Sequence, residues 1–328
     1  MKRKTIRIGT RDSNLALWQA KLVEKKLIDL GYNTEIIAIK SQGDIILNKP
    51  LYELGITGIF TKNLDVALLN NTIDIAVHSM KDVPTILPKD IVQGAVLKRG
   101  NSSDVLVYKE NLDFLTASAT IATGSLRRKA QWLHKYSQHH LVDLRGNVNT
   151  RLQKLKDNNW SGAIFAKAGL ERLDFIIDDA NNNTENKSKI ISNNTTFLST
   201  ELEWMIPAPA QGAIVIATLQ NQQELIEALK EINDTSTEIC THIERSFLNT
   251  LEGGCTAPIG AIAVLNNNVV CFKGALFSLN GKESIIVKKK CTFDNYFHFG
   301  KECAKEILES GGKNIMKNIK KEQNLSKN

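Results

Sequence analysis

The sequence predicts an α/β protein of two lobes followed by a small C-terminal α+β domain. Between residues 5 and 230, short apolar runs alternate with segments of helical periodicity, a pattern typical of sheets covered by helices. Four of the turns that join such a run to the next helix carry arginines. Residues 261–293 instead alternate apolar and polar side chains around the turns NNN and NG, which predicts three strands joined by hairpins.

The first lobe is expected to comprise residues 1–99 and 213–230. Its first strand, TIRIG, leads into a helix that ends at Gly31, and Ser13 is one candidate for the N-cap of that helix. A second strand, EIIAIKS, precedes the turn-rich stretch QGDIILNKPLYELGITGIF, whose two central glycines predict a mobile loop. The helix TKNLDVALLNN then leads to the buried strand at residues 73–77.

The turn after this buried strand carries His78, Lys81 and Asp82. Charged groups just past the carboxyl end of a buried strand lie where α/β sheets usually place their chemistry. Arg11 is expected between a strand end and a helix start, where free N–H groups favour anions, although an ordinary surface arginine is an equal alternative. We therefore interpret Asp82 as one carboxylate among many cations, and we assign no catalytic role to His78.

The second lobe, expected at residues 100–206, repeats the strand-then-turn arrangement in TIATGSLRRKAQ, LVDLRGNVNTRL and AIFAKAGLERL. Two arginines in the first turn of the helix that begins with LRRKAQ oppose the helix dipole. A bound carboxylate or phosphate would resolve this conflict, and a solvated basic turn is the alternative. The polar side chains at the three turns are Thr123, Ser125, Arg127, Arg128, Arg145, Arg151, Lys167 and Arg172.

The rest of the chain predicts an insertion and a third domain. Residues 177–200 are polar and rich in asparagine, which is typical of a solvated loop. The segment MIPAPAQGAIVIATLQ returns to a strand and carries the chain back to the first lobe. Residues 235–328 are expected to form the C-terminal domain, with the helix STEICTHIERSFLNTLEGG before the three strands and the helix FHFGKECAKEILESGG after them.

The composition of the chain favours some classes of partner over others but does not identify the function. The chain has 328 residues and a net charge of +7, so a nucleic-acid partner is one interpretation. Aromatic residues make up only 6%, and the arginines gather at strand ends rather than along one face, which favours a small polyanionic substrate. An exported binding protein for an acidic solute is a further alternative. No run reaches the ~18 apolar residues of a membrane span, and we see no export signal, so we expect a cytoplasmic protein.

The five cysteines predict neither a disulfide framework nor a zinc site, because their number is odd and no CxxC spacing occurs. Cys255 stands apart, since LEGGCTAPIG places it on a tight loop, although a small buried residue is the common alternative for a lone cysteine. No carboxylate or cysteine lies at ligand spacing from His134, His139 and His140. We interpret these histidines as surface residues and expect no metal.

Seven motifs then occur in order along the chain: RIGTRDSNLALWQA, VHSMKDVPT, TGSLRRKAQ, LRGNVNTRL, AGLERL, PAPAQGA and ERSFLNTLEGGCTAPIGA. Together they resemble the porphobilinogen deaminase (hydroxymethylbilane synthase) family of tetrapyrrole biosynthesis. The resemblance runs from Arg7 to about Ala261. It implies two lobes like those of periplasmic binding proteins, plus a third domain that carries the cysteine.

The resemblance also implies a reaction. Four porphobilinogen molecules lose ammonia and join head to tail into hydroxymethylbilane, on a dipyrromethane cofactor bonded to Cys255 through a thioether. Asp82 is implied to be the catalytic carboxylate of a monomeric, cytoplasmic enzyme. The implied cofactor-binding residues are Lys81, Thr123, Ser125, Arg127, Arg128 and Arg145. The implied substrate-binding residues are Arg11, Ser13, Gln19, Arg151 and Arg172.

The sequence departs from the family pattern at several positions. Ala122 and Gly124 stand where a glycine and a serine are usual. Thr57 replaces a usual lysine in the expected mobile loop, Ala210 a usual glycine, and Ala217 a common glutamate. None of these positions is Asp82, Cys255 or one of the named arginines, so we expect an active enzyme with altered kinetics.

Overall fold

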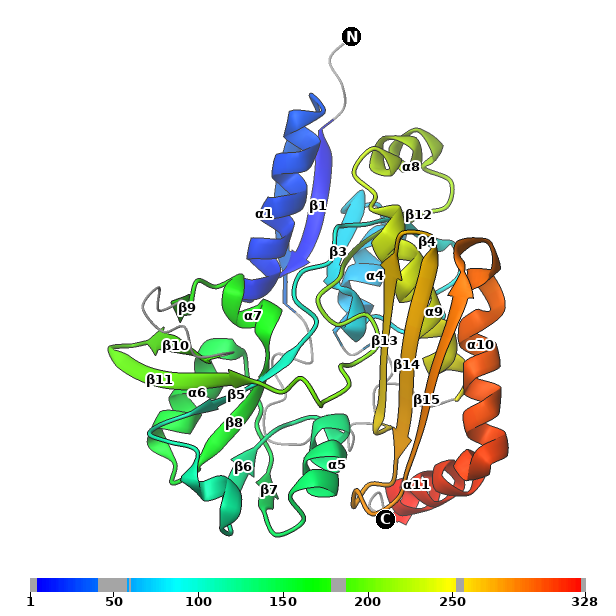
Figure 1. The fold of residues 1–328 in the computed structure, drawn as a ribbon. Helices are drawn as coiled ribbons and strands as arrows, with labels where there is room; N and C mark the ends of the chain where they lie inside the picture. The colour runs from blue at the N-terminus through cyan, green and yellow to red at the C-terminus, as the bar shows by residue number, and fades with distance from the viewer. Residues whose placement is uncertain (1–4, 41–57, 59, 178–186, 252–256, 326–328) are drawn as a thin grey trace.

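The computed structural model describes residues 5–40, 58, 60–177, 187–251 and 257–325 (Figure 1). The described chain forms three sheets, each covered by helices. We call the first sheet with its helices lobe 1, the second lobe 2 and the last the third domain. None of the helices in these residues is long and apolar enough to span a membrane. The expected α/β class, with two lobes and a C-terminal α+β unit, is confirmed.

Lobe 1 is built on a five-stranded sheet in which the N-terminal strands run parallel and a late strand returns antiparallel. In spatial order the strands are β2 (Thr34–Ile39), β1 (Ile6–Arg11), β3 (Ile75–Ser79), β12 (Ile214–Leu219) and β4 (Ile91–Val96). Its helices are α1 (Asn14–Asp29), α4 (Lys62–Leu69) and α8 (Gln223–Lys230). Strand β3 is an apolar run because it is central and buried. The 3₁₀ turn η1 (Met80–Asp82) follows it directly.

Lobe 2 is built on a seven-stranded sheet whose parallel strands β7, β6 and β8 lie together at one side. In spatial order its strands are β7 (His140–Val142), β6 (Thr120–Ala122), β8 (Gly162–Ala166), β5 (Asp104–Tyr108), β11 (Thr195–Glu201), β10 (Lys187–Ser192) and β9 (Ile176–Ile177). Its helices are η2 (Asp113–Thr116), α5 (Leu126–Lys135), α6 (Val148–Asp157) and α7 (Lys167–Glu171). Each parallel strand therefore ends where a helix with a basic start begins.

The prediction of a solvated loop over residues 177–200 is wrong for its second half. Strands β10 and β11 form an antiparallel hairpin there, and β11 pairs with the central strand β5. The hairpin buries Ile190 and Phe197 in the core of lobe 2. Asn193 and Asn194 both adopt positive φ, 48° and 57°, as the tight turn of such a hairpin requires. These asparagines are therefore turn residues, while residues 178–186 lie outside the described chain.

The third domain contains the three expected strands as an antiparallel meander, β13 (Ile259–Asn266), β14 (Val269–Phe277) and β15 (Ser284–Thr292). One face of this sheet packs on α9 (Thr235–Thr250) and α10 (Tyr296–Ile307) (Figure 1). The short turn η4 (Phe293–Asn295) precedes α10, and η5 (Leu308–Gly312) joins it to α11 (Lys313–Leu325). Helix α11 was not expected, because its sequence is dominated by basic and polar residues. It nevertheless buries the three apolar side chains of Ile315, Met316 and Ile319 in the core of the domain.

Two neighbouring connections join the lobes, at residues 97–103 and 202–213. They are held side by side by backbone hydrogen bonds, among them Gly100 N–H to Gly212 O at 3.1 Å. Gly212 has φ +87°, and a Cβ there would lie 2.8 Å from the carbonyl oxygen of Gly100, so only glycine fits. The chain therefore crosses between the lobes through a narrow, closely bonded pair of segments.

A buried ion pair fixes these connections to the third domain. Glu244 of α9 is fully buried, and its carboxylate accepts hydrogen bonds from Arg99 Nη1 at 2.6 Å and Nη2 at 3.1 Å. The same carboxylate accepts the backbone N–H groups of Ala210 and Ala263 at 2.6 and 2.7 Å. Because every bond is charge-assisted, α9 holds both the lobe connection and the sheet of its own domain. The sequence did not point to this pair.

Candidate active site

The turn after β3 places Lys81 and Asp82 at the carboxyl edge of the first sheet, and both side chains are half-buried. Strands β1 and β3 are parallel neighbours, so Arg11 at the end of β1 lies at the same edge. Burial, with a further contribution from the charge of Arg11, lowers the pKa of the buried His78 to about 4. His78 is therefore neutral at pH 7.

Three further residues of lobe 1 support this edge. The Ser13 hydroxyl caps α1 by accepting the N–H of Ala16, as the sequence predicts. The buried Gln19 donates from Nε2 to the hydroxyl of Ser79, the last residue of β3, at 2.8 Å. The guanidinium of Arg11 lies 4.3 Å from the centre of the Phe60 ring, within cation–π distance. Ser13 therefore caps the helix after β1, and Gln19 links α1 to the end of β3 at the charged edge.

Lobe 2 presents a buried carboxylate that the sequence analysis missed. Asp104, at the start of β5, accepts hydrogen bonds from Arg127 Nη1 at 2.7 Å and from Arg128 Nε and Nη2 at 3.0 and 2.8 Å. Burial would raise the pKa of Asp104, but the charges of both arginines hold it well below its ordinary value. The two arginines are themselves buried, each with a second bond to a backbone carbonyl.

This arrangement changes the interpretation of the basic first turn of α5. Ser125 caps the helix by accepting the N–H of Arg128, and the Thr123 hydroxyl accepts the N–H of Ser125. The conflict between the arginines and the helix dipole is resolved by Asp104, so it does not by itself require an external anion. Whether Arg127 and Arg128 also bind cofactor stays a prediction. An aspartate that begins an otherwise apolar strand, DVLVY, was the available signal for this network.

Gln211 joins the charged groups of the two lobes. Its buried side chain donates from Nε2 to Asp104 Oδ1 at 2.9 Å and to Ser102 O at 2.7 Å. Its Oε1 accepts a hydrogen bond from Lys81 Nζ at 3.4 Å. The amide lies on the connection between the lobes, so it links the turn after β3 to the network of Asp104. The motif PAPAQGA contains this residue, but nothing in the motif shows its partners.

Charged groups of both lobes affect the pKa of Arg151. Its Nε donates to Gly146 O at 2.7 Å. Burial, together with the charges of Arg128 and Arg145, lowers the pKa of Arg151 to about 10. Arg11 acts in the same direction from lobe 1, and Asp82 opposes it. Arg151 of lobe 2 therefore lies within electrostatic range of Arg11 and Asp82 of lobe 1, and their common role at one site stays a prediction.

The described contacts of Arg172 and Lys167 are with other residues than these. Arg172 Nη2 donates to Gly212 O at 2.6 Å, and its guanidinium lies 5.6 Å from the centre of the Trp18 ring. Burial lowers the pKa of Arg172 to about 10. Lys167 pairs with Glu201 of the same lobe. Both cations thus have partners in the described structure, and Arg172 bonds the connection between the lobes.

The charged group fits an anionic cofactor with several carboxylates. Burial lowers the pKa of Lys81 to about 8, the charges of Arg128 and Arg127 act in the same direction, and Asp82 and Asp104 oppose them. Cations whose charged forms are disfavoured in this way are stabilised by added negative charge. The buried Nε of Arg127 has no hydrogen-bond partner among the described residues. The acetate and propionate groups of a dipyrromethane would supply such acceptors.

Two predicted features fall on residues that the structure does not describe. Cys255, the expected attachment point of the cofactor, lies in the undescribed segment 252–256, between α9 and β13. The expected mobile loop, residues 42–60 with Thr57, lies almost entirely in undescribed residues, since only Gly58 and Phe60 of it are described. Neither prediction is tested by the geometry.

The described departures from the family pattern have visible consequences. Ala210 has φ +61°, a left-handed conformation that suits the usual glycine, and the carboxylate of Glu244 holds its N–H. A Cβ on Gly124 would lie 2.5 Å from Leu144 O, so the usual serine does not fit this backbone. Ala122 and Ala217 are buried, and Ala217 packs in the core of lobe 1. None of the four displaces a charged group of the site.

The prediction that the histidine cluster lies on the surface is confirmed for His134 and His140, which are exposed, and is wrong for His139. Its ring is buried, stacks on Tyr136 and accepts a hydrogen bond from Trp132 Nε1 at 3.1 Å. His134 bonds Gly281 O of the third domain at 2.7 Å. Among the described residues, no group of three histidine, cysteine or acidic side chains is arranged to hold a metal ion.

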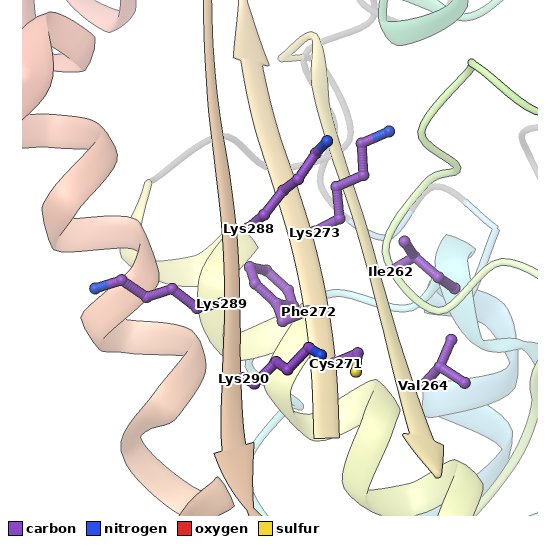
Figure 2. Close-up of a pocket in the computed structure, with 8 residues that line it drawn as sticks. All are labelled: Ile262, Val264, Cys271, Phe272, Lys273, Lys288, Lys289 and Lys290. Carbon is purple, nitrogen blue, oxygen red and sulfur yellow. The ribbon is translucent and has the colours of Figure 1, made fainter. Parts of the chain in front are cut away.

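An open hollow of about 430 Å³ lies elsewhere, on the third sheet. Figure 2 shows Cys271, Lys273 and Lys288 beside this hollow, whereas the side chain of Lys289 extends toward the opposite side. Lys289 pairs with Glu306 of α10. The residues that line the hollow all belong to β13, β14 and β15. It is therefore separate from the edge that carries Asp82.

Replacing Asp104 by asparagine is expected to lower the free energy of unfolding by about 3–5 kcal/mol, because Arg127 and Arg128 would remain buried without a carboxylate. Urea denaturation at pH 7 measures this change. The exposed Asp113 of the same lobe provides a matched control, and Asp113→Asn should change stability by less than about 0.5 kcal/mol. A similar small change for Asp104→Asn would contradict the assigned network.

Lys81→Met is expected to stabilise the primer-free chain at pH 7 by about 1–3 kcal/mol, because the native state disfavours the charged lysine. Below pH 8 both folded and unfolded states are protonated, and the destabilisation by Lys81 is fully present. Between pH 8 and 10.5 the unfolded state binds more protons, so stability rises with pH and the gain from Lys81→Met shrinks. Urea denaturation in a Cys255→Ser background across this pH range measures the effect, and a pH-independent difference would contradict it.

The chain matches two models of one protein family along most of its length. Residues 6–227 match the family model described as "Porphobilinogen deaminase, dipyromethane cofactor binding domain", and residues 238–309 match "Porphobilinogen deaminase, C-terminal domain". A probable porphobilinogen deaminase of Methanocaldococcus jannaschii is 40% identical to this chain, over a region that spans 88% of this chain and 94% of that protein. The porphobilinogen deaminase of Pelotomaculum thermopropionicum is 37% identical, over a region that spans 98% of this chain and 99% of that protein.

Among solved structures, the periplasmic VFT2 domain of Bordetella pertussis BvgS is similar at a TM-score of 0.39 and 12% identity, over 70% of this chain and 86% of that one. The identity to the deaminases extends over nearly the whole length of each protein. The two family models and these full-length relatives show that the chain belongs to the porphobilinogen deaminase family, with a dipyrromethane cofactor-binding region in residues 6–227.

Proposed function

We propose that the chain joins four porphobilinogen molecules head to tail into hydroxymethylbilane, with Asp82 as the catalytic carboxylate and with Cys255 as the attachment point of the dipyrromethane. Family membership supplies the reaction. The observation that supports the assignment of residues is the position of Asp82 in η1, at the carboxyl edge of the first sheet and next to Lys81. Its charge opposes the lowering of the pKa of Lys81 and also that of Arg151 from the other lobe.

The cations around Asp82 are proposed to bind the acetate and propionate groups of cofactor and substrate. Each porphobilinogen unit brings two carboxylates, so a growing chain needs several cations in one place. Arg145 and Arg151 of lobe 2 and Arg11 of lobe 1 are suited to this, because a guanidinium can bind a carboxylate through two parallel hydrogen bonds. Lys81 adds a positive charge next to Asp82.

Asp82 is proposed to act where positive charge develops. Loss of ammonia from porphobilinogen leaves an electron-poor pyrrole, and a fixed carboxylate stabilises that cation. The same carboxylate can accept the pyrrole N–H proton and return it. The dipyrromethane, when bound, supplies the terminal pyrrole to which the first substrate unit is added. The cap of Ser13 on α1 and the hydrogen bond from Gln19 to the Ser79 hydroxyl join α1 to the neighbouring strand end.

The arginines of α5 are proposed to have two roles at once. Asp104 fixes the guanidiniums of Arg127 and Arg128, and this fixed geometry orients their remaining N–H groups. The unpartnered Nε of Arg127 is one donor that a cofactor carboxylate could use. Thr123 and Ser125 complete the turn with hydroxyl groups at the start of the helix. Arg172 is proposed to serve substrate binding from the connection between the lobes.

We also propose the organisation in which this enzyme works. Lobe 1 comprises residues 1–99 and 213–230, lobe 2 residues 100–206, and the cysteine-bearing domain residues 235–328. One chain is expected to suffice, because charged groups of both lobes gather within it. The free thiols of Cys240, Cys271, Cys291 and Cys303 suit the reducing cytoplasm. No nucleic acid or membrane is assigned as a partner.

Incubation of the purified chain with porphobilinogen tests this function. The expected result is release of four ammonia molecules per tetrapyrrole formed, followed by ammonia assay and by absorbance of the oxidised porphyrin. Size-exclusion chromatography with light scattering should give the mass of one chain. Binding of porphobilinogen without ammonia release would instead identify a solute-binding protein and contradict the proposal.

A further inference from the structure

The turn that carries Asp82 is held from outside its own lobe. Arg245 of α9 donates from Nη1 to Val83 O at 2.9 Å and to Met80 O at 3.4 Å. Its Nη2 donates to Pro84 O at 2.6 Å. The three carbonyls lie on both sides of Asp82 along the chain, so a single guanidinium from the third domain brackets the carboxylate.

The turn is a short 3₁₀ turn, in which Val83 N–H donates to Met80 O at 3.2 Å. Met80 N–H also donates to Ala213 O at 3.0 Å. A 3₁₀ turn of three residues has poor internal hydrogen-bond geometry. The conformation that aims the Asp82 side chain therefore depends strongly on contacts from α9.

A second contact of the same helix reaches the same turn. Asn249 lies one helical turn after Arg245, and its Oδ1 accepts a hydrogen bond from the Thr85 hydroxyl at 2.9 Å. The residue before Arg245, Glu244, holds the connection between the lobes through Arg99 and Ala210. Helix α9 thus fixes the turn of Asp82 relative to the point where the two lobes join.

We propose that Arg245 is a positioning residue for the reaction: it holds the turn of residues 80–84 so that the Asp82 carboxylate faces the reacting pyrroles. This inference rests on the proposed function of Asp82. The planar guanidinium suits the role because its rigid fork can meet several carbonyls at once, which a lysine ammonium cannot do in the same geometry. A misplacement of about 1 Å at a reacting group can reduce a rate roughly hundredfold.

Two variants of Arg245 test the proposal. Arg245→Gln is expected to lower kcat by about 10- to 100-fold while KM changes by less than about twofold, because the cations that bind substrate carboxylates are untouched. Arg245→Lys should give an intermediate kcat. Both proteins should keep the excess mass of the covalent primer. Lys301→Gln, which removes an exposed positive charge from α10 of the same domain, should leave kcat unchanged.

A double-mutant comparison separates positioning from a purely structural role. In an Asp82→Asn background, Arg245→Gln is expected to cost less than about twofold in rate, because the group that it positions is already absent. The same loss in both backgrounds, or a wild-type kcat in Arg245→Gln, would overturn the proposal. If Arg245→Gln does not fold, Arg245→Lys decides, since an unchanged kcat there also overturns it.

The outcomes also separate this inference from the function on which it rests. If Asp82→Asn alone keeps most of the rate, the proposed role of Asp82 fails, and the positioning role of Arg245 fails with it. If Asp82→Asn removes the rate but Arg245→Gln keeps it, the role of Asp82 stands and only the positioning role is overturned.

Discussion

Replacing Cys255 by serine is expected to yield a folded chain that carries no covalent primer and makes no tetrapyrrole. The thiolate is the nucleophile of cysteine, and a serine hydroxyl has no comparable nucleophilicity without an activating base. Intact mass after denaturation measures the difference directly. The wild-type chain should exceed its sequence mass by two pyrrole units, and Cys255→Ser should match its sequence mass.

The other thiols provide the control for this experiment. Cys271 is half-buried on the third sheet, so it is accessible enough to report non-specific attachment. Cys271→Ser should keep both the excess mass and the activity. An unmodified mass in active wild-type enzyme, or an excess mass that persists in Cys255→Ser, would contradict attachment at Cys255.

Asp82→Asn is expected to lower kcat by about 10³-fold or more, because the amide keeps the shape of the side chain but removes its negative charge and its ability to accept a proton. The surrounding cations would then face the developing positive charge without compensation. Initial rates of ammonia release at saturating porphobilinogen measure the loss. Stability should change little, since the side chain is only half-buried.

Two controls keep this result specific to Asp82. Asp113→Asn removes an exposed carboxylate of lobe 2 and should leave kcat unchanged. The intact mass of Asp82→Asn should show whether the primer is still attached, which separates a defect in turnover from a defect in loading. Retention of most of the wild-type rate by a loaded Asp82→Asn protein would remove Asp82 from its role.

The periodic parts of the fold could be predicted from the sequence. Buried strands such as β3 are apolar runs, and α1 combines helical spacing with the cap at Ser13, so local pattern and final structure agree. The hairpin of β10 and β11 was missed because its asparagines resemble a solvated loop. Only Asn193 and Asn194, both with positive φ, belong to the turn of this hairpin. Strand β11 pairs with β5 and buries Phe197.

The charged residues of the site could be named from the motifs, but their partners could not. Arg127 and Arg128 look unpaired along the chain, because Asp104 that binds them lies more than twenty residues earlier, on another strand. The links made by Gln211 and Arg245 are longer still, and both cross between lobes or domains. Such pairs depend on the tertiary fold and cannot be predicted from local sequence patterns.

A crystal structure of the primer-loaded enzyme tests the central claim most directly. The decisive measurement is the distance from the Asp82 carboxylate to the pyrrole nitrogens. We expect hydrogen-bond distances of about 2.6–3.2 Å, with the primer's carboxylates on cations of both lobes, Arg151 among them. A primer whose nitrogens lie out of reach of Asp82, or whose carboxylates bind outside this group of cations, would contradict the account.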